Sequence, residues 1–301
     1  MGAFAFPTWF IIKKGLMRVD KKPDLVLCCV VRVWVACDGD RRVLNPIRAL
    51  CTFLLAAGCM LFVSGPLTTA WGGPPFLTDD PAPVDYKHSE AYLFSTLDKA
   101  KDGSTIAGPA FEFNRGILPD VQFHLVVPLV NILPSEGDSH HGLGDIEVGI
   151  KYRFVQETGN IPQAGIFPMA ELPSGDSNRG LGNGRTWVKL PLWIQKSWGP
   201  WTTYGGGGYA VNHAPDQRNY TFGGWLLQRE ISESLTLGGE LFAQGATSVD
   251  GRSTSICNLG GYYNFTPNFS LLFSAGRSVA GERHSIGYAG LYWTWGPTRP
   301  K

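Results

Sequence analysis

Short segments in which apolar and polar residues alternate run through the chain from residue 88 onward. The clearest spans residues 142–154, GLGDIEVGIKYRF. Because successive side chains of a strand point to opposite faces, one face of this segment is apolar and the other is polar. Such alternation predicts β-strands. The apolar face holds Ile146, Val148, Ile150, Tyr152 and Phe154, and the polar face holds Asp145, Glu147, Gly149, Lys151 and Arg153.

Twelve such segments are predicted, separated by turn residues. They reach or exceed the roughly 9–11 residues that a tilted strand needs to cross a bilayer. Proline inside three of them (Pro109, Pro168 and Pro191) is unfavourable, because proline lacks the N–H that a sheet requires. The predicted strands are 88–97, 103–114, 119–130, 142–154, 161–172, 184–197, 199–211, 218–229, 233–245, 252–264, 267–276 and 283–295.

The connections alternate between tight turns, as at Gly199 and Pro267, and longer polar loops. The long loops are predicted at 134–142, 173–184, 212–218, 245–251 and 276–283. Counting along the chain places all of them at one end of the sheet. Outer-membrane barrels have short periplasmic turns and long outer loops, whereas the alternative, a soluble β-sandwich, has no reason to keep this rhythm. We therefore predict an all-β fold, an antiparallel transmembrane β-barrel of about 12 strands.

Composition agrees with a barrel. The chain has 38 Gly among 301 residues, 12% aromatic residues and only 17% charged residues, whereas about a quarter of a soluble domain is charged. Aromatic residues gather near the predicted strand ends, as in interfacial girdles; packing in a soluble core is the alternative for this feature alone. Residues 71–301 carry 17 Lys and Arg against 21 Asp and Glu, which argues against a nucleic-acid partner.

Residues 41–70 have the layout of a cleavable signal peptide. Arginines precede an apolar stretch from Ala49 to Val63, Pro66 ends it, and small residues up to Ala70 offer a cleavage site. A membrane anchor is the alternative, but the apolar run is short for a spanning helix.

Three further divisions follow from the position of this signal. Residues 1–40 do not fit a signal peptide, and we expect an upstream extension outside the working protein, with the natural start near residue 43. Residues 71–87 are Pro-rich and are predicted to be irregular. The barrel is predicted to occupy residues 88–301.

Catalytic and metal-binding motifs are not evident in the sequence. His140 and His141 follow Asp138 and Ser139 in a predicted outer loop, but members of a catalytic triad normally come from separated positions. A weak metal site at these histidines is an alternative to a solvated loop. Neither GxSxG nor HExxH occurs, and five of the six cysteines lie in the first 70 residues without zinc-binding spacing. We predict no enzyme, no metal and no cofactor.

The segments 142–154 and 164–209 resemble the bacterial outer-membrane family labelled "MetA-pathway of phenol degradation". The resemblance covers roughly residues 85–295. It implies a barrel in the outer membrane of a Gram-negative bacterium that takes up aromatic or other small hydrophobic compounds, and it carries no catalytic or ligand-binding motif. The implied partners are outer-membrane lipid, a small-molecule solute and the barrel-insertion machinery, for which we expect Trp295 to act as the terminal aromatic residue.

Function in such a barrel depends on the inward face. Inward charges of both signs would select solutes; the alternative is that they form salt-bridge networks that fill the lumen. A barrel of about twelve strands lies between filled and open barrels, so the lumen is predicted to be narrow and residues 71–87 are a candidate to occlude it. Alternate residues of a strand share one face, so the charged residues on the inward face of each predicted strand are candidates to line the lumen. They are Glu112, Asp145, Glu147, Lys151, Arg153, Glu171, Arg185, Lys189, Arg229 and Glu240.

The leading hypothesis is an outer-membrane channel or transporter for small solutes, aromatic or hydrophobic, that works by passive or facilitated diffusion. A structural or adhesive barrel without transport is the first alternative. An outer-membrane hydrolase is the second.

Overall fold

The computed structural model describes residues 74–297. The predicted extension at 1–40, the predicted signal at 41–70 and the start of the irregular segment lie outside the described residues. Among residues 74–297, no helix has the length and apolar character needed to cross a membrane. The one helical element described is a 3-10 turn, η1 (Ser177–Arg179).

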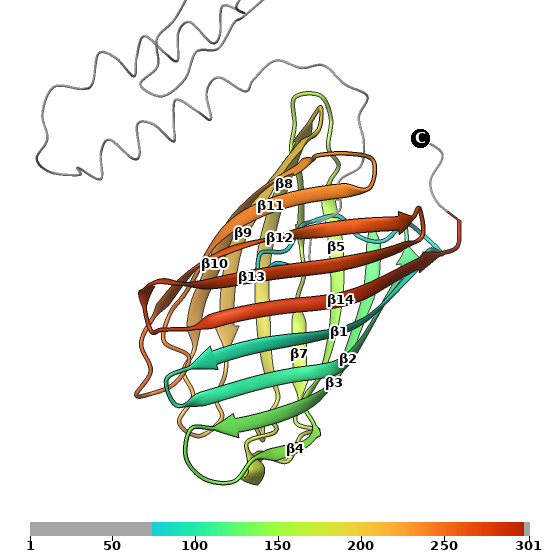
Figure 1. Cartoon of the computed structure of the whole chain (residues 1–301). Coiled ribbons are helices and arrows are strands. Elements are labelled where there is room, and N and C mark those ends of the chain that lie inside the picture. The colour runs from blue at the N-terminus through green and yellow to red at the C-terminus, as the bar shows by residue number, and fades with distance from the viewer. Residues whose placement is uncertain (1–73, 298–301) are drawn as a thin grey trace, which may run out of the picture. The chain divides into compact units, whose positions relative to one another are not determined.

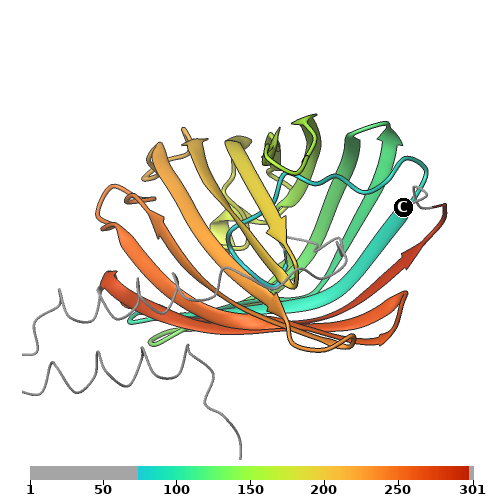
Figure 2. The same ribbon diagram turned by 90° about the horizontal axis from the view of Figure 1, so that it is seen from above.

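The strands close into an antiparallel barrel with twelve positions around its wall (Figures 1 and 2). Two positions are each filled by two short strands in line: β4 and β5 both pair with β3, and β6 and β7 both pair with β5 and β8. The β1–β14 pairing joins the first and last strands. The strands are β1 (Ser89–Ala100), β2 (Gly103–Leu118), β3 (Val121–Pro134), β4 (His140–Leu143), β5 (Ile146–Val155), β6 (Gln163–Ile166), β7 (Met169–Leu172), β8 (Trp187–Trp198), β9 (Trp201–Val211), β10 (Tyr220–Glu230), β11 (Leu235–Gln244), β12 (Thr254–Thr266), β13 (Phe269–Gly281) and β14 (Ser285–Trp295). The predicted antiparallel barrel of about twelve strands is confirmed.

Strand β5 shows which face of the wall is apolar. Ile150, Tyr152 and Phe154 are 40%, 44% and 48% exposed, whereas Lys151 between them is 5% exposed. A soluble sandwich would bury the apolar face. Here the apolar side chains point out of the barrel and the charged ones point into it, as lipid on the outside and a polar lumen require.

The three prolines are accommodated at irregularities. Pro109 lies where the β1–β2 and β2–β3 registers shift, and Pro168 lies in the break between β6 and β7. The carbonyl of Pro191 in β8 accepts a hydrogen bond from Phe167 N at 3.3 Å. Since the N–H and C=O of one residue face the same neighbouring strand in an antiparallel ladder, the N–H that Pro191 lacks would also face this break.

The ends of the barrel differ in their connections, although less regularly than predicted. One end, here the outer end, carries 135–139, 173–186, 212–219 and 245–253 together with short turns at 101–102 and 282–284. The other, the inner end, carries short turns and the seven-residue connection 156–162. The predicted long loop at 276–283 is wrong, because β13 stays paired with β12 as far as Gly281.

Residues 74–88, here the lumen segment, cross the inside of the barrel before β1 begins (Figure 2). The segment is irregular apart from a single parallel bridge between Tyr86 and Gly116 of β2. It runs from the middle of the barrel, beside Glu240 and Lys151, to the inner end at Gly116. The segment therefore lies inside the lumen, which residues 71–87 were predicted to occlude.

Candidate functional site

One side of the lumen segment is held by Glu240 of β11. The two oxygens of this carboxylate accept hydrogen bonds from the backbone N–H groups of Leu77 and Thr78, each at 2.8 Å. Oε1 also accepts from Asn258 Nδ2 at 2.8 Å, and Glu240 is 2% exposed. The irregular backbone of the segment thus obtains from the wall the acceptors that it cannot obtain from a sheet.

The opposite side is held by Lys151 of β5. Its Nζ lies 2.9 Å from Asp79 Oδ1 and 3.8 Å from Asp80 Oδ2. Burial raises the pKa of Asp80 to about 6, although the charge of Lys151 acts in the other direction. Glu240 and Lys151 together fix the segment to two separate strands of the wall.

Two cavities lie along the lumen, one on each side of the lumen segment. The outer cavity has a volume of about 600 Å³ and the inner cavity about 420 Å³. Pro74 of the segment and Tyr92 of β1 line both cavities. The boundary between the cavities is therefore formed at these two residues.

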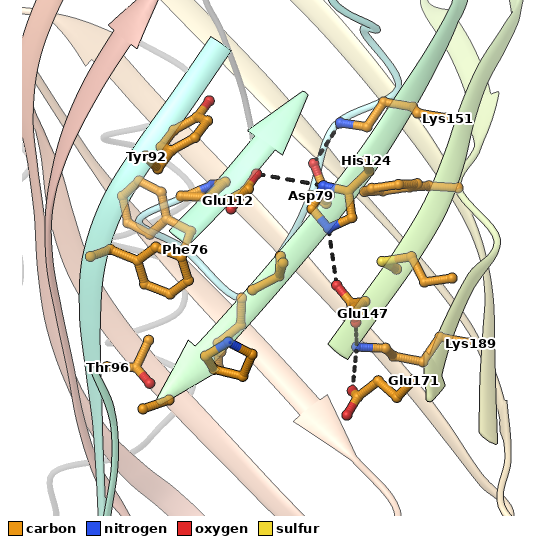
Figure 3. A pocket seen from close by; sticks show the side chains of 18 of the residues that line it. Phe76, Asp79, Tyr92, Thr96, Glu112, His124, Glu147, Lys151, Glu171 and Lys189 are labelled. Atoms are coloured by element: carbon orange, nitrogen blue, oxygen red, sulfur yellow. Dashed lines mark hydrogen bonds and ion pairs between the residues drawn. The ribbon is translucent and has the colours of Figure 1, made fainter. Parts of the chain in front are cut away.

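A ladder of charged side chains lines one side of the outer cavity (Figure 3). His124 Nδ1 lies 3.6 Å from Glu112 Oε1, and its Nε2 lies 3.1 Å from Glu147 Oε1. Lys189 Nζ lies 2.5 Å from Glu147 Oε2 and 3.3 Å from Glu171 Oε1. These five residues come from β2, β3, β5, β7 and β8, so the ladder is assembled across strands.

Aromatic rings line another part of the same cavity, on β8, β10 and β11. The ring centroids of Trp187 and Tyr220 are 6.5 Å apart, those of Tyr220 and Phe222 6.3 Å, and those of Phe222 and Phe242 6.4 Å. The β10 and β11 rings lie about half a turn of the barrel from His124 on β3. A solute in the cavity can therefore contact rings on one side and charged groups on the other.

Eight of the ten residues predicted to line the lumen point into the barrel. Arg153 is at the inner end, where it pairs with Asp120 at 2.6 Å and donates to Gln163 Oε1 at 3.1 Å. The others are Glu112, Asp145, Glu147, Lys151, Glu171, Lys189 and Glu240.

Two of the predicted positions are wrong. Arg185 precedes β8, which begins at Trp187 rather than at 184, and it is exposed in the 173–186 loop. Arg229 is exposed on the outer face of β10, with its guanidinium 5.2 Å from the Trp201 ring. The alternation of apolar and polar residues gave the wrong inward face for β10. The apolar side chain of Leu226 faces inward there, where it packs with Phe76 of the lumen segment.

Arg229→Ala is expected to leave the single-channel conductance and ion selectivity unchanged, because its charge lies outside the lumen. Recordings of the variant beside the wild-type protein in planar bilayers check this. A conductance or reversal potential that differs from that of the wild-type protein would show that the Arg229 charge acts on ions inside the barrel.

Asp145 lines the outer cavity but is engaged in holding a loop. Its carboxylate accepts hydrogen bonds from Gly175 N at 3.0 Å and Asn183 N at 2.6 Å. Asp145→Ala is expected to loosen the 173–186 loop and to speed tryptic cleavage after Arg179 and Arg185. Asp138→Ala, in the exposed 135–139 loop, is the control; equal cleavage rates in the two variants would contradict this role.

Several lumen residues were not among the predicted candidates. Glu90 and Tyr92 share the inward face of β1, and the parity of the predicted 88–97 strand could have identified them. His124 was not among the candidates either, although the alternation in β3 places it inside the barrel. Asp79 and Asp80 belong to the irregular lumen segment, where no periodicity signals the direction of a side chain.

No group of three or more His, Cys, Asp or Glu side chains suited to holding a metal ion occurs within residues 74–297. His140 lies in β4 next to His141, at the outer end of the wall. Within residues 74–297, the candidate site is a lumen lined by polar and aromatic side chains.

Comparisons with known proteins give the family. The family model described as "Putative MetA-pathway of phenol degradation" matches residues 105–295. No curated protein sequence matches the chain. An outer membrane channel from Pseudomonas putida F1 matches with a TM-score of 0.61 at 14% identity, over 72% of this chain and 98% of that one. The NanC porin matches with a TM-score of 0.50 at 7% identity, over 67% of this chain and 98% of the porin.

At these identities the solved structures establish the fold, which is that of outer-membrane channels and porins and indicates an outer-membrane location. The family model covers more than half of the chain and most of the barrel. The chain therefore belongs to the family described as "Putative MetA-pathway of phenol degradation".

Proposed function

We propose that the protein is a channel through which small aromatic solutes diffuse across the outer membrane. The observation that carries this proposal is the pair of cavities that meet at Pro74 and Tyr92 inside a barrel whose wall is closed. A structural barrel has no need of two cavities in line.

The chemistry of the outer cavity supports aromatic solutes. Its volume of about 600 Å³ is in the range of sites that hold small organic molecules. Rings such as Trp187 and Phe222 offer stacking partners to an aromatic solute. The carboxylates and the lysine of the ladder offer hydrogen-bond partners to its polar substituents. The label of the family and the channel from Pseudomonas putida F1 agree with a transport role.

Passage is expected to be slow in the wild-type protein, because the lumen segment lies between the two cavities. Diffusion is passive in this proposal, since nothing in the lumen of the described barrel supplies energy. Selectivity then comes from contacts with the cavity walls.

Swelling of proteoliposomes that contain the full chain tests the proposal. Phenylalanine is net neutral and too polar to cross lipid unaided, and glutamine is a solute of similar size without a ring. We expect phenylalanine to enter faster than glutamine, and both to enter faster than in protein-free liposomes. Entry of neither solute through folded protein would contradict a channel, and equal entry would contradict the aromatic preference.

A further inference from the structure

The boundary between the two cavities contains a buried carboxylate. Glu90 of β1 is 3% exposed and lines the outer cavity beside Tyr92. Tyr92 lines both cavities, and Tyr292 of β14 lines the inner one. A solute that moves from one cavity to the other therefore passes close to the Glu90 carboxylate.

Two tyrosine hydroxyls hold this carboxylate. Tyr92 OH donates to Oε2 at 3.0 Å and Tyr292 OH donates to Oε1 at 2.8 Å. The two rings lie with their centroids 4.7 Å apart. Each carboxylate oxygen can accept more than one hydrogen bond, so both oxygens keep capacity for a further donor. Within residues 74–297 no Lys, Arg or His forms an ion pair with Glu90.

The lysines of the outer cavity are already engaged. Lys151 lies near two carboxylates, those of Asp79 and Asp80, and Lys189 lies near those of Glu147 and Glu171. Seven Asp and Glu side chains line the outer cavity against these two lysines. Glu230 and Glu233 line the inner cavity, and no Lys or Arg of the described chain does. Both cavities are thus more acidic than basic.

We propose that Glu90, held by the hydroxyls of Tyr92 and Tyr292, makes the passage between the cavities selective for cations. This inference rests on the proposed channel function and adds its substrate class: small organic cations, above all those that carry an aromatic ring. A cation at the boundary meets a carboxylate that attracts its charge, and the rings of Tyr92 and Tyr292, which line the cavities, offer packing partners to an aromatic ring. An anion of the same size meets the same carboxylate and is repelled.

Reversal potentials of the full chain in planar bilayers under a tenfold KCl gradient test the sign of the selectivity. We expect the wild-type protein to prefer K⁺ to Cl⁻. Glu90→Gln keeps the size of the side chain and removes its charge, so the permeability ratio of K⁺ to Cl⁻ is expected to fall several-fold. Lys189→Met leaves Glu147 and Glu171 without their lysine, so the ratio is expected to rise.

Glu136→Gln is the matched control, because it removes the same charge from the exposed 135–139 loop, outside both cavities. It is expected to leave the ratio unchanged. A wild-type protein that prefers Cl⁻ or neither ion would overturn the inference, as would Glu90→Gln and Glu136→Gln variants with the same ratio.

Two permanently charged aromatic solutes give a test that needs no variant. Benzyltrimethylammonium and benzenesulfonate are similar in size and opposite in charge. We expect the cation to enter proteoliposomes faster and to block the K⁺ current, and the anion to do neither. Measurable entry without preference contradicts only this inference, whereas the absence of all current and all solute entry contradicts the proposed channel.

Discussion

Glu240→Ala is expected to raise the conductance of the channel strongly. The substitution removes the acceptor of the Leu77 and Thr78 N–H groups, which lie inside the barrel. A buried donor without an acceptor costs about 1–3 kcal/mol. The loss is therefore on the order of 3 kcal/mol, which shifts the balance between a seated and a displaced lumen segment by roughly 100-fold. Single-channel recording measures the result as more frequent or longer large openings.

Gln244→Ala is the control for this prediction. Gln244 lies on the same strand and the same inward face as Glu240, and it lines the outer cavity at a level beyond the lumen segment. The control is expected to keep the small conductance of the wild-type protein. A Glu240→Ala channel that behaves like this control would contradict the anchoring role of Glu240.

Lys151→Met is expected to displace the lumen segment from its other side and to lower the thermal stability of the barrel. Asp79 and Asp80 would lose the lysine that lies 2.9 Å and 3.8 Å from them, and Asp80 is 2% exposed. Removing one partner from a buried ion pair costs about 3–5 kcal/mol. Conductance and the temperature at which the barrel loses its heat-modifiable mobility on a gel measure the two effects.

Two further variants separate this effect from a general loss of charge. Lys196→Met removes a lysine whose partner Glu157 lies at the inner end of the barrel, with both side chains partly exposed. It is expected to change neither measurement. Adding Asp79→Asn and Asp80→Asn to Lys151→Met is expected to restore both, and a failure of this rescue would mean that Lys151 acts through something other than these carboxylates.

The sequence was sufficient to predict the wall of the barrel but less so its interior. Period-two alternation in 142–154 identified β5 and its inward charges, because lipid and water impose opposite demands on the two faces. The same rule failed for Arg229, because Leu226 faces inward toward Phe76 of the lumen segment. A residue that packs against the segment is apolar although it faces the lumen, and parity alone cannot reveal this contact.

The lumen segment could be predicted as irregular and as a candidate to occlude the lumen, but its contacts could not. The bonds of Glu240 to Leu77 N and Thr78 N join residues 163 and 162 positions apart in the sequence. No local pattern records contacts at such separations. The boundary at Glu90, Tyr92 and Tyr292 was missed for a related reason, since it depends on the pairing of the first strand with the last.

Whether the lumen is a passage between two cavities can be measured as the current that the full chain carries in planar bilayers. We expect small, discrete current steps in symmetrical KCl from folded wild-type protein, and larger openings from the Glu240→Ala variant in the same setting. Folded protein that inserts into the bilayer and carries no current, both as the wild type and as Glu240→Ala, would contradict such a passage.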